Sequence, residues 1–270
     1  MSGIPDNIIV IHPDFEKLKA EVEKLRTELS MFVLERDNLI YQECKNIEMA
    51  YMLSVGALEY KAYEIECAIL RLKRKVELIQ ANKNRQEKIV LSKIEAILDV
   101  EFAAYKEKLD EQVNKMNEAL ERSKGDMLTE SESCELKKLY RAIVKALHPD
   151  LHPDLSKEKL TLFYNAVGAY ERGDLEELRI ISTMVADPIV PDARSEGLAF
   201  LMKEKERLTK LIQNIKNRID EIKSEFPYTM KAIVQSPEKM EARKSELEER
   251  IKSLNEILSA YSRRIEEMLR

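Results

Sequence analysis

Residues that interrupt helices are almost absent from the first half of this chain. Between Pro13 and Pro149 the only Gly or Pro residues are Gly56 and Gly125. Proline removes a backbone donor and glycine adds chain entropy, so a stretch this poor in both favours long, uninterrupted helices. With 6 Gly and 8 Pro in 270 residues, and 44% hydrophobic and 35% charged side chains, the composition predicts a soluble chain of the all-α class.

Apolar residues recur at alternating spacings of three and four within these stretches. Such heptad stripes cover residues 15–39, with an interruption at Arg36, and then residues 47–79 and 91–120. We predict helix-helix turns at residues 44–46, with Asn46 as an N-cap, and at residues 82–84. Short turns fold helices back on one another, so residues 14–125 are predicted to form a long N-terminal three-helix antiparallel coiled coil.

Two further heptad stripes lie near the end of the chain, over residues 208–226 and 247–268. Ser236 and Pro237 precede the second stripe and supply an N-cap and a first-turn proline. Proline residues at 188 and 191 separate this region from the middle of the chain. We therefore predict that residues 187–270 form a C-terminal antiparallel helical hairpin.

The middle of the chain, residues 126–186, lacks regular heptads and carries a local concentration of positive charge. One face of a predicted helix is apolar and contains Leu136, Leu139, Tyr140, Ile143 and Leu147. Its opposite face carries Lys137, Lys138, Arg141 and Lys145. The chain as a whole has a net charge of −5, so this basic face stands out from an acidic background.

Every histidine in the sequence stands first in a His-Pro-Asp tripeptide, and the copy at residues 148–150 directly follows this helix. Pro149 ends the helix and favours an extended backbone at His148, which leaves Asp150 on an exposed loop. Ser156 is the predicted N-cap of a second helix with the apolar stripe Phe163, Val167 and Tyr170, which ends at Gly173. Two antiparallel helices then present a stiff loop beside a basic face, an arrangement suited to docking.

The other two tripeptides have simpler interpretations. The copy at residues 12–14 lacks a basic helix in front, and Asp14 is predicted to cap the first turn of a helix. The copy at residues 152–154 is interpreted as loop stiffening. His148, Asp150, His152 and Asp154 are metal-ligand types, but two prolines prevent the single helical face that a histidine pair at this spacing needs, so we predict no metal and no cofactor.

The stretch from Leu136 to Asp150, LKKLYRAIVKALHPD, resembles the second helix and loop of the J domain of DnaJ-type co-chaperones. Residues 163–170, FYNAVGAY, resemble that family's third helix, and the resemblance covers about residues 134–181. No counterpart of the family's first helix precedes Leu136, and we expect the end of the third stalk helix to cover this core. The family's Gly/Phe-rich linker and cysteine-rich zinc module also have no counterpart.

The resemblance implies docking onto a DnaK-type chaperone ATPase and acceleration of its ATP hydrolysis. His148, Pro149 and Asp150 would form the stimulating loop, and the basic face would meet an acidic partner surface. Charge complementarity of this kind mainly increases the rate and orients the encounter. Catalysis would remain with the partner, so this chain is predicted not to be an enzyme.

Composition and short motifs restrict the remaining functions. A net charge of −5 and a pI near 5.6 argue against a nucleic acid or an anionic membrane as partner. Cys44, Cys67 and Cys134 lie far apart without metal-ligand spacing, and no apolar run is long enough for a signal peptide or a membrane span, so we expect a cytoplasmic protein.

Our hypothesis is a J-domain-like helical hairpin between coiled coils, which recruits a DnaK-type ATPase to an unidentified client or cargo. The alternative is a coiled-coil scaffold whose J-like segment is structural and inactive. Heptads specify association but not whether a seam lies within or between chains, so a monomer and a homo-oligomer both stay open.

Overall fold

The computed structural model describes residues 13–124, 128–185 and 197–270. Within these ranges the regular elements are all helices, which confirms the predicted all-α class. The chain divides into two compact units, each assembled from separate parts of the sequence. Unit 1 comprises Met1–Cys44 and Asp126–Phe226, and unit 2 comprises Lys45–Gly125 and Pro227–Arg270.

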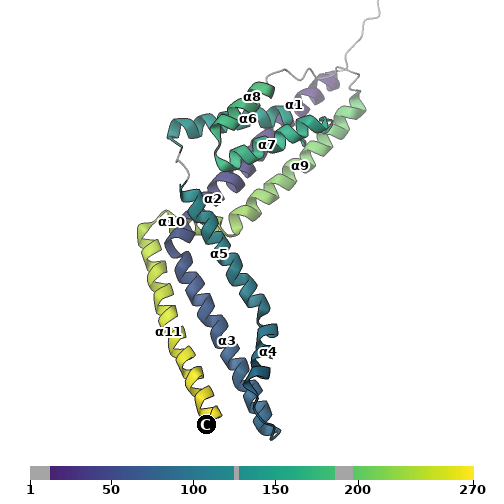
Figure 1. The fold of residues 1–270 in the computed structure, drawn as a ribbon. Coiled ribbons are helices and arrows are strands. Elements are labelled where there is room, and N and C mark those ends of the chain that lie inside the picture. Colours follow the sequence, from purple (N-terminus) through teal and green to yellow (C-terminus); the bar gives the residue numbers. More distant parts are fainter. Residues whose placement is uncertain (1–12, 125–127, 186–196) are drawn as a thin grey trace, which may run out of the picture. The chain divides into compact units, whose positions relative to one another are not determined.

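Unit 1 combines a pair of long helices with a three-helix bundle (Figure 1). The long pair is α1 (Pro13–Asn38) and α9 (Leu198–Ser224). The bundle contains α6 (Glu130–Leu147), α7 (Lys157–Arg172) and α8 (Leu175–Val185), in which α6 packs against both α7 and α8. A π-helical segment, η1 (Leu39–Cys44), follows α1 and contacts α7 and α9.

The helices α1 and α9 are parallel. Lys205, Lys216 and Lys223 of α9 lie 2.7, 3.1 and 2.7 Å from glutamates of α1 whose numbers rise in the same order, Glu21, Glu28 and Glu35. The seam beside these ion pairs is mostly apolar and contains Val22, Leu29, Val33, Leu201 and Leu208, all buried. Removing such side chains from water supplies most of the pairing energy, because exposed ion pairs contribute little.

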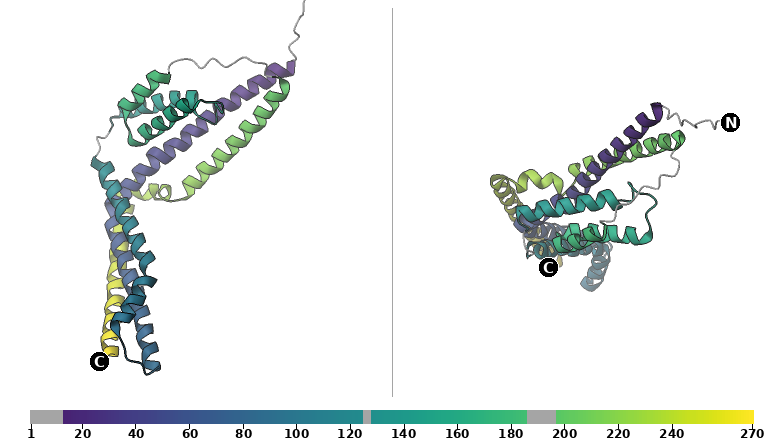
Figure 2. Two further views of the ribbon diagram at one scale, coloured as in Figure 1. Left: turned by 45° about the vertical axis from the view of Figure 1, so that its right-hand side comes forward. Right: turned by 90° about the horizontal axis from the view of Figure 1, so that it is seen from above.

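Unit 2 is built on the long helix α3 (Ala57–Asn84). The helix α11 and the pair of α4 and α5 flank it (Figure 2). Its elements are α2 (Lys45–Tyr51), the π-helical segment η2 (Met52–Gly56), α3 (Ala57–Asn84), α4 (Leu91–Glu101), α5 (Ala103–Lys124), η3 (Tyr228–Met230), α10 (Lys231–Val234) and α11 (Pro237–Leu269).

The directions of the helices in unit 2 follow from their ion pairs. Arg243 and Arg250 of α11 pair with Glu59 and Glu66 of α3, so these two helices are parallel. Arg71 pairs with Asp99, and Lys75 with Glu95, so α3 and α4 are antiparallel. The core contains Val76, Ile79, Ile94, Leu98 and Ile265 at one end and Tyr51, Val55 and Leu247 near the other.

The predicted domain boundaries differ from the structure in two places. The first stalk helix belongs to unit 1, so residues 14–125 are not one three-helix coiled coil. Residues 187–270 do not form the predicted antiparallel hairpin, because α9 belongs to unit 1 and α11 to unit 2, and each is parallel to its partner. A heptad stripe shows that a helix needs an apolar partner but identifies neither that partner nor its direction.

The turn predicted at residues 44–46 is also absent. The π-helical segment η1 leads directly into α2, and Asn46 is no N-cap: its Oδ1 accepts hydrogen bonds from Arg122 Nε and Nη2 at 3.2 and 3.0 Å. The spacing from Leu39 to Ile47 exceeds a heptad by one residue. A π-helical turn accommodates one additional residue without breaking the helix, which explains why the phase shift did not require a turn.

Other local predictions differ in outcome. The turn predicted at residues 82–84 lies slightly later in the structure, because α3 continues through Asn84 and Gln86, with a φ of 57°, lies in the turn that follows. Ser236 caps α11, since its Oγ accepts a hydrogen bond from the Lys239 amide at 3.3 Å. The helix α1 begins at Pro13, so Asp14 lies within its first turn and not at the predicted capping position, and His12 lies outside the described residues. No helix in the described part of the chain has the length and apolar character needed to cross a membrane.

Candidate functional site

Local capping interactions fix both helices of the predicted docking hairpin. A capping box starts α6: Thr129 Oγ1 accepts from the Glu132 amide at 3.2 Å, and Glu132 Oε2 accepts from the Thr129 amide at 2.8 Å. At its other end His148 is extended, with φ −68° and ψ 127°, as expected before Pro149. Ser156 caps α7, which ends at Gly173 in the left-handed conformation.

The inner faces of α6 and α7 form the core predicted for the J-like segment. Leu136, Tyr140, Ile143 and Leu147 of α6 are buried, as are Phe163 and Tyr170 of α7, whereas Leu139 and Val167 are half-buried. The rings of Tyr140 and Tyr170 stack nearly parallel with centroids 4.0 Å apart. This core sets the position of the loop between the two helices.

The His-Pro-Asp loop combines a buried ring with an accessible carboxylate. His148 is 4% exposed, and its ring meets the edge of Phe163 at a centroid distance of 5.1 Å. Its Nδ1 accepts a hydrogen bond from the Asp150 amide at 3.0 Å, so the neutral ring carries its proton on Nε2. Burial lowers the pKa of His148, and this outweighs the opposite effect of Asp150. The Asp150 side chain is 37% exposed.

The loop backbone is tied closely to the end of α6. The amides of Leu151 and His152 both donate to the His148 carbonyl, at 3.0 and 2.9 Å. His152 Nε2 lies 2.7 Å from the Lys145 carbonyl, so the second tripeptide bonds back to α6. Pro153 and Asp154 are exposed. These contacts agree with the interpretation of residues 152–154 as loop stiffening.

The predicted basic face lies along α6 and leads to the loop. Lys137, Lys138, Arg141 and Lys145 are all exposed. None of the four forms an ion pair with another residue in the described ranges, although most arginines of this protein do pair. Their charge is therefore directed to solvent on the same hairpin that carries Asp150.

The sequence did not reveal the contribution of α1 to this site. Asp37 is 1% exposed; its Oδ2 accepts a hydrogen bond from Tyr140 Oη at 2.8 Å, and its Oδ1 accepts from Arg36 Nε and Nη2 at 2.8 and 2.6 Å. Burial raises the pKa of Tyr140, with Asp37 adding to the effect, so the phenol remains a donor. The Gln42 side chain donates to the Tyr170 carbonyl.

The helix α1 and segment η1 thus pack on the core of α6 and α7, where the end of the third stalk helix was expected. A sequence signal for this contact was present, because Arg36 and Asp37 stand where the first heptad stripe is interrupted. We interpreted that break only as an irregularity of the coiled coil.

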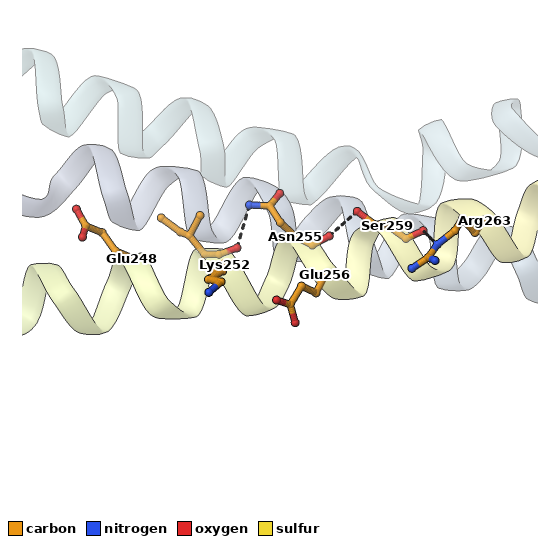
Figure 3. Close-up of a pocket in the computed structure, with 7 residues that line it drawn as sticks. Glu248, Lys252, Asn255, Glu256, Ser259 and Arg263 are labelled. Carbon is orange, nitrogen blue, oxygen red and sulfur yellow. Dashed lines mark hydrogen bonds between the residues drawn. The ribbon is translucent and has the colours of Figure 1, made fainter.

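Two other potential sites offer little chemistry. Within the described ranges, no group of three or more His, Cys, Asp or Glu side chains is placed to hold a metal ion. An open groove of about 570 Å³ along α11 is lined by that helix alone (Figure 3). Its Asn255 and Ser259 side chains donate to carbonyls one turn back on the same helix, at 2.9 and 2.8 Å, so these donors are already used.

Comparison of this chain with protein-family models, with curated proteins and with solved structures finds no match. The assignment of a function therefore depends on the residues and geometry of the site itself.

Proposed function

We propose that this chain is a J-domain-like co-chaperone, which docks on a DnaK-type ATPase through the loop at residues 148–150 and accelerates its ATP hydrolysis. The observation that carries the proposal is the loop geometry. The His148 ring is packed into the hairpin core and holds the Asp150 amide, while the Asp150 side chain is 37% exposed, with its Oδ2 4.0 Å from His148 Nδ1. A buried anchor beside an exposed charge suits a stiff docking tip.

The charge distribution supports the same proposal. The four exposed cations on α6 would attract an acidic surface and orient it along the helix, and the loop at the end of α6 would supply specificity. The chaperone itself would carry out hydrolysis. The two parallel helix pairs would hold a client or cargo, and cysteines as far apart in the sequence as Cys44, Cys67 and Cys134 would suit a reducing, cytoplasmic setting.

The test is single-turnover ATP hydrolysis by the cognate DnaK-type chaperone, with and without this protein. Wild type should increase the rate, and Asp150→Asn should abolish the increase, because it removes the exposed negative charge with almost no change in shape. Asp154→Asn is the matched control, since it makes the same change in the neighbouring tripeptide and should stimulate like wild type. Equal stimulation by wild type and Asp150→Asn would refute the mechanism.

A coiled-coil scaffold with an inactive J-like segment remains the competing function. The buried contact between Asp37 and Tyr140 favours it, because this contact ties the hairpin to α1 as a structural part. Affinity capture separates the two. If wild type and Asp150→Asn both fail to recover the chaperone but recover the same other partner, the scaffold function is correct.

A further inference from the structure

Arg207 of α9 extends to the His-Pro-Asp loop from a distant part of the sequence. Its Nη1 donates a hydrogen bond to the main-chain carbonyl of Asp150 at 3.0 Å. Its Nε and Nη2 donate to the two carboxylate oxygens of Glu204 at 2.7 and 2.8 Å. The bidentate pair fixes the plane of the guanidinium, so its remaining edge is aimed at the loop.

Glu204 occupies an unusual place for a charged residue. It lies between Leu201 and Leu208 on the buried seam of α9 and is only 9% exposed. Arg26 of α1 approaches it at 3.5 Å, and Arg207 holds the pKa of its carboxyl below the ordinary value. An apolar residue at such a seam position would usually be at least as stabilising as a buried ion pair. The buried carboxylate therefore suggests a role beyond helix pairing, and its main contact is Arg207.

The contact made by Arg207 also indicates what it does to the loop. The guanidinium binds the carbonyl of Asp150, and the described ion pairs include none between Arg207 and the Asp150 carboxylate. On the other side of the same residue, the Asp150 amide donates to His148. The backbone of Asp150 is thus held at both ends while its side chain stays accessible, as expected of a support rather than a block.

We propose that Arg207 is a positioning residue of the docking loop: aimed by Glu204, it holds the Asp150 carbonyl and thereby sets the direction of the Asp150 carboxylate. This inference rests on the proposed co-chaperone function. The paired helices α1 and α9 then have a part in docking, because they place the guanidinium. Fixing a loop in its binding conformation raises affinity by lowering the cost of ordering it.

The first measurement is hydrogen exchange of the full-length protein over residues 148–154. Arg207→Ala should accelerate exchange of the Leu151 and His152 amides about 10-fold, the expected result of losing a hydrogen bond to a charged group. A double variant, Glu204→Leu with Arg207→Ala, should show the same acceleration. It makes the seam apolar, so its α1 and α9 amides should remain as protected as in wild type.

The second measurement is the concentration of this protein that gives half-maximal ATPase stimulation. Both variants should raise it up to about 10-fold, because a smaller fraction of loops is ready to bind, and should leave the maximal rate unchanged. Loss of the docking carboxylate in Asp150→Asn should lower the maximal rate instead. Arg218→Ala is the matched control: Arg218 lies on α9 and pairs with Glu221, three residues later, at 2.9 Å.

The inference would be overturned if both variants exchanged the amides of residues 148–154 at the wild-type rate. It would also be overturned if the concentration for half-maximal stimulation were unchanged. If the wild-type protein itself fails to stimulate the chaperone, the proposed function is wrong, and Arg207 then has no role in docking. The exchange experiment would still decide separately whether Arg207 restrains the loop.

Discussion

Replacing Tyr140 by Phe removes one oxygen atom from the core of unit 1 and leaves the rest of the side chain in place. The lost hydroxyl donates to Asp37 Oδ2 at 2.8 Å, and Asp37 is almost completely buried. Hydrogen bonds to charged groups contribute about 1.5–3 kcal/mol. Arg36 still satisfies Oδ1, so the carboxylate keeps its countercharge and the loss stays below the roughly 3–5 kcal/mol of a broken buried ion pair.

We therefore expect Tyr140→Phe to destabilise unit 1 by about 2 kcal/mol. The protein contains two units, so a single unfolding midpoint would mix their stabilities. Hydrogen exchange of peptides from α6 and α7 avoids this difficulty and should accelerate about 30-fold. Peptides from α3 and α11 in unit 2 should exchange as in wild type.

Tyr164→Phe is the matched control, because Tyr164 lies on α7 and is 63% exposed. Its effect should stay within about 0.5 kcal/mol. A loss of less than about 0.5 kcal/mol for Tyr140→Phe would show that the contact between α1 and α6 does not stabilise the hairpin core.

Two further outcomes follow from local geometry. Burial lowers the pKa of His148, so as the pH falls through about 6.5 the unfolded chain binds a proton that the folded chain does not, and unit 1 becomes less stable. After correction for the intrinsic pH dependence, hydrogen exchange of α6 peptides should accelerate toward pH 5.5, and this acceleration should be larger in wild type than in His148→Gln. Equal acceleration in the two proteins would contradict a buried, neutral His148 ring. Gly173 has a φ of 74°, so Gly173→Ala should destabilise unit 1 by about 1–2 kcal/mol, whereas Gly168→Ala, inside the same helix, should be neutral or stabilising by up to about 1 kcal/mol. Hydrogen exchange of peptides from α7 checks the pair, and faster exchange in both variants would point to packing rather than to backbone conformation.

The predictions that hold are those decided by a few neighbouring residues. Pro149 ends a helix by its own covalent structure, Ser156 and Ser236 cap helices through amides three residues later, and Gly173 accepts a left-handed backbone. None of these features depends on distant parts of the chain. The hairpin of α6 and α7 and its buried face could therefore be predicted from the sequence.

Long-range pairing could not be predicted in the same way. The stripes of α1, α3, α9 and α11 are nearly equivalent in pattern, so the sequence alone favoured neighbours joined by short turns, and the parallel pairs were missed. Asp37 and Glu204 were missed for another reason. Charged residues are rarely buried, so neither was singled out from the sequence as a candidate for a buried contact. Their partners Tyr140 and Arg207 identify them only once the fold brings the elements together.

The buried carboxylate of Glu204 also restricts how α1 and α9 can align. Sliding one helix along the other by a heptad, about 10 Å, would separate Glu204 from Arg26, its partner on α1, and leave Arg207 of its own helix as its countercharge. Uniform leucine seams tolerate several alignments, but a seam with one embedded charge strongly prefers a single one. The contact of Glu204 with Arg26 thereby favours the alignment that brings Arg207 to the loop.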